Sequence, residues 1–417
     1  MSNENIKVIL DSSKSCDERL AALAALGDPM PEGGGEWVNN HIHTTYSFSP
    51  YTPTAAVYFA RKAGLSTAGI MDHDSVGGLS EFIKAGKTVG MPVTVGFECR
   101  TSVAGTPLEG LRLNNPDQKS VAYVTLHGIP HSQIGECEKV LYPLREKRNE
   151  RNRKMCEKIN ELCAPLGITL DFEKDVLPLS LDCEGGSVTE RHVLFGLALK
   201  MCEGKKRGEA VELIEKLCGT LSEKVCEKLI NAPDEFYLYD VLGVLKSSLV
   251  SKIYVDADCE LMHIRDFCAL AKRVGGICAY AYLGDVGESP TGDKAAQKFE
   301  DSYLEKLFEC LKDFGFNAVT YMPSRNTKDQ LARVMSLCEE HGFFQISGED
   351  INSPRQSFVC DAMADYSHLY SATWALIGHE KAATDDITCG MFSDKMIELM
   401  PSLSERIAYF EKIGKNL

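Results

Sequence analysis

The 16 cysteines of this 417-residue chain include no CxxC pair. Zinc ribbons and redox dithiols use that spacing, so neither is expected. No segment approaches ~20 uninterrupted apolar residues, and the first residues lack the basic region and apolar core of an export signal. The sequence therefore argues against membrane spans and secretion, and we expect a reducing, cytoplasmic location.

Positive charge is also scarce. The chain carries 45 Lys and Arg residues against 60 Asp and Glu residues, which gives a net charge of −15. Such a protein has no general field that attracts nucleic acid or an anionic membrane, so neither is an expected partner. An anionic substrate must be held by a local cationic site.

Two common catalytic signatures are missing as well. Gly33, Gly34 and Gly35 precede an expected strand instead of joining a strand to a helix, and no Lys-Ser/Thr follows them. A P-loop nucleotide hydrolase is therefore excluded. No GxSxG elbow occurs, which argues against a serine hydrolase of that kind.

Apolar runs alternate with helical patterns in two parts of the chain. The first part predicts strands over 37–43, 67–71 and 92–97, with helices over 54–63 and 79–88. The second predicts strands over 276–280, 318–321 and 343–347, with helices over 294–314 and 327–341. This βαβ order is typical of parallel strands covered by helices.

The middle of the chain reads differently. A long charged helix is expected over 134–166, and further helices over 189–229 are interrupted at Gly204 and Gly219. We expect a mostly helical insertion on an α/β core. The predicted organisation is a helical extension over 1–35, the first part of the core over 36–130, the insertion over 131–250, and the rest of the core with C-terminal helices over 251–417.

The stretch from Arg145 to Arg153 (REKRNERNR) interleaves charges at helical spacing. We interpret it as a solvated helix face with i,i+4 ion pairs, in preference to a surface that binds phosphate or nucleic acid.

Histidines and carboxylates follow the first three expected strands. His41 and His43 are two residues apart on a strand, so both rings point to one face. His73, flanked by two aspartates, follows the second strand, and Glu98 ends the third. The carboxyl ends of parallel strands meet at one edge, and imidazole and carboxylate groups are ligands for transition metals. The sequence therefore predicts a metal site at this edge.

The stretch from His41 to Glu98 resembles the polymerase and histidinol phosphatase (PHP) family in motif order and spacing. Residues 187–201 (SVTERHVLFGLALKM) resemble a helix near that family's site, and residues 318–352 resemble its last two barrel units. The resemblance implies a distorted (β/α)7 barrel of PHP type, with a mostly helical insertion. It also implies a cluster of two or three metals that hydrolyses phosphate esters with a metal-bound hydroxide.

The resemblance implies metal ligands at six positions, with Glu98 as a bridge: His41, His43, His73, Glu98, His127 and Asp350. For one of the six, Tyr123 is an alternative to His127. Three other positions depart from the family pattern. Tyr280 and Asn352 stand where histidines are expected, and Ser49 stands where an acidic residue is common. The mixed nitrogen and oxygen ligands fit one to three ions of manganese, iron or zinc.

The resemblance also implies residues for catalysis and for substrate binding. Arg191 and His192 match the family's helix and are predicted to hold the phosphate, and Tyr280 is predicted to donate a proton. Substrate contacts are predicted at four positions of the same rim: Arg100, Arg325, Asn352 and Arg355. A guanidinium fork pairs well with two phosphate oxygens.

The sequence thus predicts a metal-dependent phosphoesterase that acts on a small phosphorylated metabolite or nucleotide. One alternative is a binding or regulatory module whose metal site has partly decayed, as Tyr280 and Asn352 would suggest. Another is an amidohydrolase-type metal hydrolase, because an HxH motif on the first strand is also found in such sites.

Overall fold

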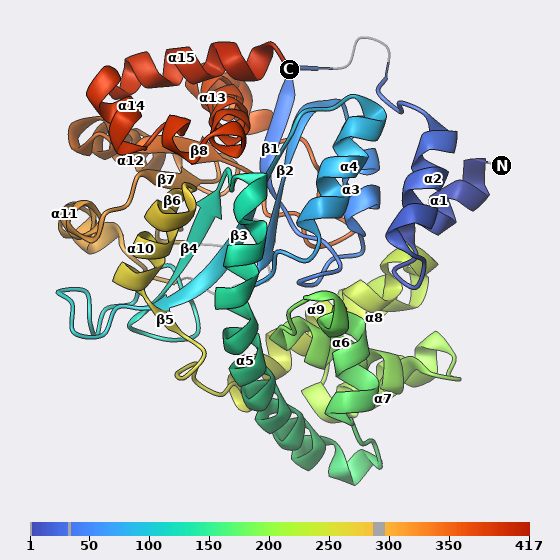
Figure 1. The fold of residues 1–417 in the computed structure, drawn as a ribbon. Coiled ribbons are helices and arrows are strands. Elements are labelled where there is room, and N and C mark those ends of the chain that lie inside the picture. Colours follow the sequence, from blue (N-terminus) through green and yellow to red (C-terminus); the bar gives the residue numbers. More distant parts are fainter. Residues whose placement is uncertain (1, 32–34, 287–296) are drawn as a thin grey trace.

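The computed structural model describes residues 2–31, 35–286 and 297–417 (Figure 1). The strands are β1 (Trp37–Ile42), β2 (Leu65–His73), β3 (Val93–Ser102), β4 (Val121–His127), β5 (Met262–His263), β6 (Ile277–Ala281), β7 (Ala318–Tyr321) and β8 (Phe344–Ser347). The α-helices are α1 (Ser2–Leu10), α2 (Cys16–Leu26), α3 (Pro53–Lys62), α4 (Leu79–Val89), α5 (Ile134–Cys163), α6 (Glu190–Cys202), α7 (Arg207–Cys218), α8 (Glu223–Asn231), α9 (Asp234–Ile253), α10 (Ile264–Val274), α11 (Leu304–Phe314), α12 (Lys328–His341), α13 (Ser367–Asp385), α14 (Asp394–Leu399) and α15 (Leu403–Lys415).

The sheet follows the order β1-β2-β3-β4-β6-β7-β8, and β5 pairs with β3 outside this path. β1, β2 and β3 are parallel, and so are β6, β7 and β8. The barrel closes where the segment after β8 meets the end of β1. There His43 N donates to Ile351 O (2.9 Å), and Ile351 N donates to His41 O (3.1 Å). The predicted α/β barrel with a distorted seven-strand path is confirmed.

β4 runs antiparallel to both of its neighbours, β3 and β6. The connection from β3 to β4 contains turns and no helix between residues 103 and 120, so the chain returns beside β3 in the opposite direction. β3 also continues to Ser102, beyond its predicted end at residue 97, because its outer half pairs with β4 and β5. Glu98 therefore lies within the strand.

Local sequence signals explain several helix ends. Thr52 caps α3 by accepting from Ala55 N, and Pro53 starts the helix. Thr327 and Gln330 form a capping box at the start of α12, which ends at Gly342 with a φ of 69°. The helices therefore begin and end close to the predicted positions.

The helix predicted over 294–314 is shorter than expected. Residues 294–296 lie outside the described residues, as do Gly33 and Gly34, and α11 begins at Leu304. Gln297 and Val286 instead exchange two backbone hydrogen bonds of 2.9 Å. Their backbone groups are used in this bridge, so the helix cannot extend back to residue 297.

The helices between β4 and β5 form a second hydrophobic core beside the barrel (Figure 1). Helix α5 follows β4 in the chain and runs from the barrel into this group, which includes α6, α7, α8 and α9. The mostly helical insertion is confirmed, whereas the predicted boundaries at residues 35, 130 and 250 stay a prediction.

The interpretation of residues 145–153 of α5 as a solvated charged face is wrong for three of the seven charged residues in this stretch. Arg145, Arg148 and Arg151 are buried, at spacings of three residues on one side of the helix. Glu146 and Lys147, on the other side, are exposed. The buried arginines face carboxylates of the barrel and of the insertion, contacts that helical periodicity cannot anticipate.

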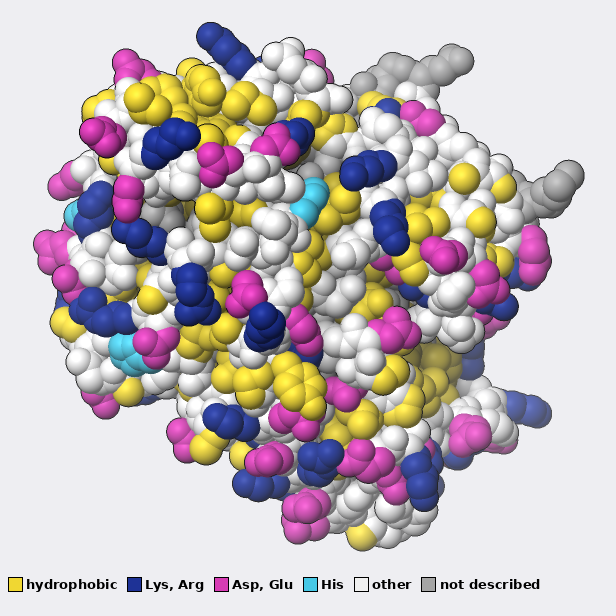
Figure 2. Space-filling model, viewed as in Figure 1, with side chains coloured by type: hydrophobic (Ala, Val, Ile, Leu, Met, Phe, Trp, Pro, Cys, Tyr) yellow, Lys and Arg dark blue, Asp and Glu magenta, His cyan; other side chains and the backbone are white. Residues whose placement is uncertain are grey.

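On the face shown in Figure 2, acidic and basic side chains are interspersed, without a broad patch of either sign. Among the helices of the described ranges, none combines the length and apolar character that crossing a bilayer requires.

Candidate metal centre

Five side chains converge at the carboxyl edge of the barrel. His41 and His43 come from the end of β1, His73 ends β2, Glu98 lies in β3, and Asp350 follows β8. Their ligand atoms form two groups, each within 4.8 Å: His41, His43 and Asp350, and His43, His73 and Glu98. His43 belongs to both groups.

Glu98 lies among three of the imidazoles. Its Oε2 is 3.0 Å from His73 Nδ1, 3.7 Å from His41 Nε2 and 4.0 Å from His43 Nε2. On the other side of His43, Asp350 Oδ1 is 3.1 Å from Nε2. Imidazole nitrogens and carboxylate oxygens in such a mixed set are typical donors for a divalent transition metal.

A chain of hydrogen bonds determines the tautomer of His43. Ser47 Oγ donates to Asp72 Oδ1 (2.6 Å), so its only hydrogen is used. His43 Nδ1, 3.1 Å from Ser47 Oγ, must then be the donor of that pair. Thr44 holds the same carboxylate with its backbone N–H (2.7 Å) and its hydroxyl (2.6 Å). The lone pair of His43 therefore lies on Nε2, which is directed toward Asp350.

This arrangement fits a cation. A neutral His43 Nε2 and the Asp350 carboxylate are both acceptors, so they cannot hydrogen-bond to each other at 3.1 Å. The buried His43 Nε2 has no hydrogen-bond partner among the described residues. A metal ion between the two groups would satisfy both, and the Ser47–Asp72 pair is the kind of support that metal-bound histidines have.

We expect Asp72→Asn to weaken metal binding about 10–100-fold, because the amide no longer orients Ser47 and His43 through a full negative charge. Competition with a chromophoric chelator measures this change. Asp266→Asn, on the exposed side of α10, is the matched control and should leave the affinity unaltered. Equal affinities of the two variants would contradict the support assigned to Asp72.

The charges at the centre influence one another. Burial would raise the pKa of Glu98, but His73 and His41 outweigh it and hold this pKa well below its usual range. Burial also opposes the charged form of His41, whereas Glu98 and Asp350 raise its pKa above the usual value. Burial lowers the pKa of His43. Glu98 is therefore an ionised acceptor at the centre of the cluster.

His127 and Tyr123 occupy different depths of the barrel. Because β4 is antiparallel, its first residues lie at the edge of the metal centre and its last residues lie toward the opposite edge. The ring of Tyr123 is 5.8 Å from that of His73. His127 is buried, neither ring nitrogen has a hydrogen-bond partner within the described ranges, and burial lowers its pKa to about 3. The structure thus brings Tyr123, and not His127, to the mouth of the site.

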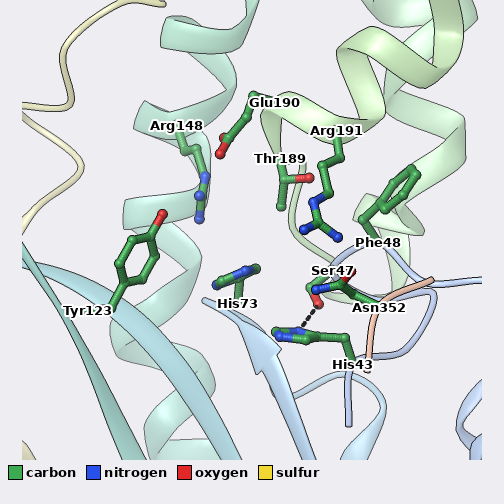
Figure 3. Close-up of a pocket in the computed structure, with 10 residues that line it drawn as sticks. All are labelled: His43, Ser47, Phe48, His73, Tyr123, Arg148, Thr189, Glu190, Arg191 and Asn352. Carbon is green, nitrogen blue, oxygen red and sulfur yellow. Dashed lines mark hydrogen bonds between the residues drawn. The ribbon is translucent and has the colours of Figure 1, made fainter. Parts of the chain in front are cut away.

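Two cavities open from the metal centre. The narrow one is shown in Figure 3, and its walls are His43, Ser47, Phe48, His73, Tyr123, Arg148, Thr189, Glu190, Arg191 and Asn352. The wide one is a cleft of about 790 Å³ between helix α9 and the ends of β6 and β7. Four residues line both cavities: His73, Tyr123, Glu190 and Arg191. The two cavities therefore adjoin at these four residues.

The structure supports the predicted position of only one residue of the phosphate-binding pair, Arg191 and His192. Arg191 lines both cavities, as its predicted role requires. His192 is buried, and its Nδ1 accepts from Thr189 N (3.0 Å) in the capping box of α6. Burial lowers the pKa of His192 to about 3, and its ring contacts Phe48 edge-on. Its contacts in the structure are those of a helix cap.

Three other predicted residues are not brought to the metal centre. Arg100 is buried in an ion pair with Glu260 (2.5 Å). Tyr280 is fully buried in the hydrophobic core, because it lies on the side of β6 opposite Ala281, which lines the wide cleft. Arg355 forms a double ion pair with Asp240 on α9, at 2.8 and 2.7 Å.

The remaining predicted substrate contacts do lie at the cavities. Arg325 lines the wide cleft and donates to Leu283 O (3.3 Å). Asn352 lines the narrow pocket, where its side-chain amide donates to Asp350 Oδ1 (2.6 Å). Asn352 therefore orients a candidate ligand.

Sequence reasoning missed several residues of the site. Arg148 and Glu190 line the narrow pocket, although neither belongs to a motif at a strand end. Arg148 forms a buried ion pair with Asp74, the residue after the candidate ligand His73. Ser47 and Asp72 support His43 from positions next to the motifs. For Ser47 and Asp72 the available signal was the polar residue pattern directly after His43 and before His73, whereas Arg148 and Glu190 lie in the stretches 145–153 and 187–201.

Comparisons with known proteins support the fold. No family-wide sequence pattern matches the chain. A 5′-3′ exoribonuclease of Haemophilus influenzae is 32% identical over 74 residues, which are 18% of this chain and 27% of that protein. A solved structure from Bifidobacterium adolescentis, assigned as a metal-dependent phosphoesterase, has a TM-score of 0.51 and 18% identity, covering 79% of this chain and 94% of that one. An amidohydrolase structure from Chromobacterium violaceum, with bound sulfate and no metal, has a TM-score of 0.51 and 18% identity, covering 78% and 90%. At this identity the likeness shows a shared fold.

Proposed function

We propose that this protein is a metal-dependent phosphoesterase that hydrolyses phosphate monoesters or diesters of a small metabolite or nucleotide. The observation that carries the proposal is one pocket in which candidate metal ligands and two guanidinium groups meet: His43 and His73 with Arg148 and Arg191. Divalent cations and guanidinium forks both bind phosphoryl oxygens. The fold shared with a protein assigned as a phosphoesterase is in line with this chemistry.

The residues that would hold the metal are His41, His43, His73, Glu98 and Asp350. Manganese, iron or zinc suits this donor set, and two ligand groups that share His43 favour two ions. When bound, such ions polarise phosphoryl oxygens, activate water and stabilise the leaving oxygen.

The protein's own residues bind and orient the substrate in this proposal. Arg191 takes non-bridging phosphate oxygens, since a guanidinium fork matches two oxygens at once. Arg148, which is paired with Asp74, adds positive charge beside the phosphate. Asn352 holds Asp350 in place, and Ser47 holds His43. The wide cleft receives the leaving group.

Two alternatives are tested by the same measurements. An amidohydrolase would cleave amides, but the cationic side chains of the narrow pocket favour a phosphate over an uncharged amide. A binding or regulatory module would hold metal or ligand without turnover.

We expect elemental mass spectrometry of chelator-free protein to find two transition-metal ions per chain. Phosphate release from a panel of monoesters and diesters should then require metal, stop with a chelator and return when metal is restored. A chain that holds no transition metal would contradict the proposal. Bound metal without phosphate release would favour a binding module, and cleavage of amides alone would favour an amidohydrolase.

A further inference from the structure

Among the described residues, Glu190 is the one acidic side chain that lines both the narrow pocket and the wide cleft. It is the first residue of α6, and Figure 3 shows its carboxylate directed into the pocket near Arg148. Its Oε2 is buried and has no hydrogen-bond partner in the described part of the chain. The Nε atoms of Arg100 and Arg148 are likewise buried without a partner there. A buried carboxylate oxygen of this kind calls for a hydrogen-bond donor.

The surroundings keep this carboxylate ionised without neutralising it in an ion pair. Burial would raise the pKa of Glu190, but Arg100, Arg151 and Arg148 outweigh burial and hold this pKa well below its usual range. Arg100 and Arg151 are paired with Glu260, and Arg148 is paired with Asp74. The arginines thus stabilise the charge of Glu190, while the ion pairs that they form are with Glu260 and Asp74.

An ionised carboxylate only accepts hydrogen bonds, and it repels phosphate oxygens. It cannot share in binding the phosphate, which the neighbouring guanidinium groups favour. Glu190 lies where the narrow pocket opens into the wide cleft, the place at which a leaving group would join its phosphate. A hydrogen-bond donor on the leaving group would satisfy Glu190 at this place.

We propose that Glu190 is a specificity-determining residue, which accepts a hydrogen bond from a hydroxyl or ammonium group on the second carbon from the ester oxygen. The preferred substrates are then phosphate esters of polyols or amino alcohols, and esters with an anionic group at that position are rejected. This inference rests on the phosphoesterase function proposed above.

A matched series of esters tests the inference: 2-hydroxyethyl phosphate offers a donor, ethyl phosphate offers nothing, and phosphoglycolate places a carboxylate at the same distance. The full chain is used throughout, with dissociation constants measured before metal is added and kcat/KM measured with manganese. We expect 2-hydroxyethyl phosphate to have a dissociation constant about tenfold lower and a kcat/KM about tenfold higher than ethyl phosphate, as a hydrogen bond to a charged group would give. Phosphoglycolate should be the weakest of the three.

Glu190→Gln should reduce the preference for 2-hydroxyethyl phosphate to about threefold or less and improve the relative binding of phosphoglycolate, because the amide is neutral and can donate. Glu203→Gln, at the exposed end of the same helix, is the matched control and should preserve the order of the three esters. The order in the unmodified protein tests the inference even if the Glu190 variant fails to fold.

The outcomes distinguish a failure of the role of Glu190 from a failure of the proposed phosphoesterase function. Three esters that bind equally and release phosphate equally would overturn the role of Glu190 and leave the phosphoesterase in place. The expected order of binding without phosphate release would support Glu190 as the selecting residue and overturn the hydrolytic function. An order that survives Glu190→Gln would overturn the inference.

Discussion

His43→Ala is expected to reduce bound metal from two ions to at most one per chain, and to lower phosphoesterase turnover by more than about a hundredfold. His43 is the side chain that both candidate ligand groups share, so its removal leaves each group incomplete. Even outer residues that only orient a ligand change metal affinity about 10–100-fold, and loss of the ligand itself should cost more. Elemental mass spectrometry and phosphate release measure the two effects.

His341→Ala is the control for this variant, because His341 lies at the end of α12 among phenylalanine rings and apart from both ligand groups. It should keep full metal content and turnover. If His43→Ala kept both ions and its activity, the two ligand groups would not be the metal centre.

Arg148→Met is expected to destabilise the protein and to weaken phosphate binding together. The substitution leaves the Asp74 carboxylate buried without its ion-pair partner, and breaking such a pair typically costs about 3–5 kcal/mol of unfolding free energy. It also removes one of the two guanidinium groups of the narrow pocket, so we expect KM for a phosphate ester to rise about tenfold. Urea denaturation and steady-state kinetics measure the two effects.

A second substitution separates these effects. Asp74→Asn in the Arg148→Met background removes the uncompensated charge, so much of the lost stability should return while KM stays high. Arg153→Met is the matched control on the same helix, because the Arg153–Glu173 pair is exposed and should contribute no more than about 1 kcal/mol. An Arg148→Met protein as stable as Arg153→Met would contradict the role of the buried pair.

Local patterns were sufficient to predict the parallel parts of the barrel. The apolar runs of β2 and β7 and the capped helix α12 are encoded within short windows, so their positions could be read directly. The direction of β4 could not be predicted from local patterns, because it depends on which strands pair across the sheet. Tyr123 rather than His127 reaches the cleft for that reason.

The candidate metal centre was partly predictable for the same physical reason. His41, His43 and His73 stand at or beside the ends of parallel strands, and such ends share one edge of the barrel. Arg100 was predicted to lie at the same edge because it follows a predicted strand end, yet its side chain pairs with Glu260, more than a hundred residues away in the chain. An ion pair of that kind depends on how the insertion packs against β3.

The sequence by itself determined the alternation of strands and helices and the histidines at the ends of β1 and β2, and it contains neither a P-loop motif nor a CxxC pair. These features depend on residue type and on spacing over a few positions. The tertiary structure decided that Arg148 and Glu190 line the pocket, that Asp72 and Ser47 orient His43, and that Tyr280 packs in the core. Those outcomes follow from the packing of segments far apart in the chain, which places a charge or a ring on one side of an element in preference to the other.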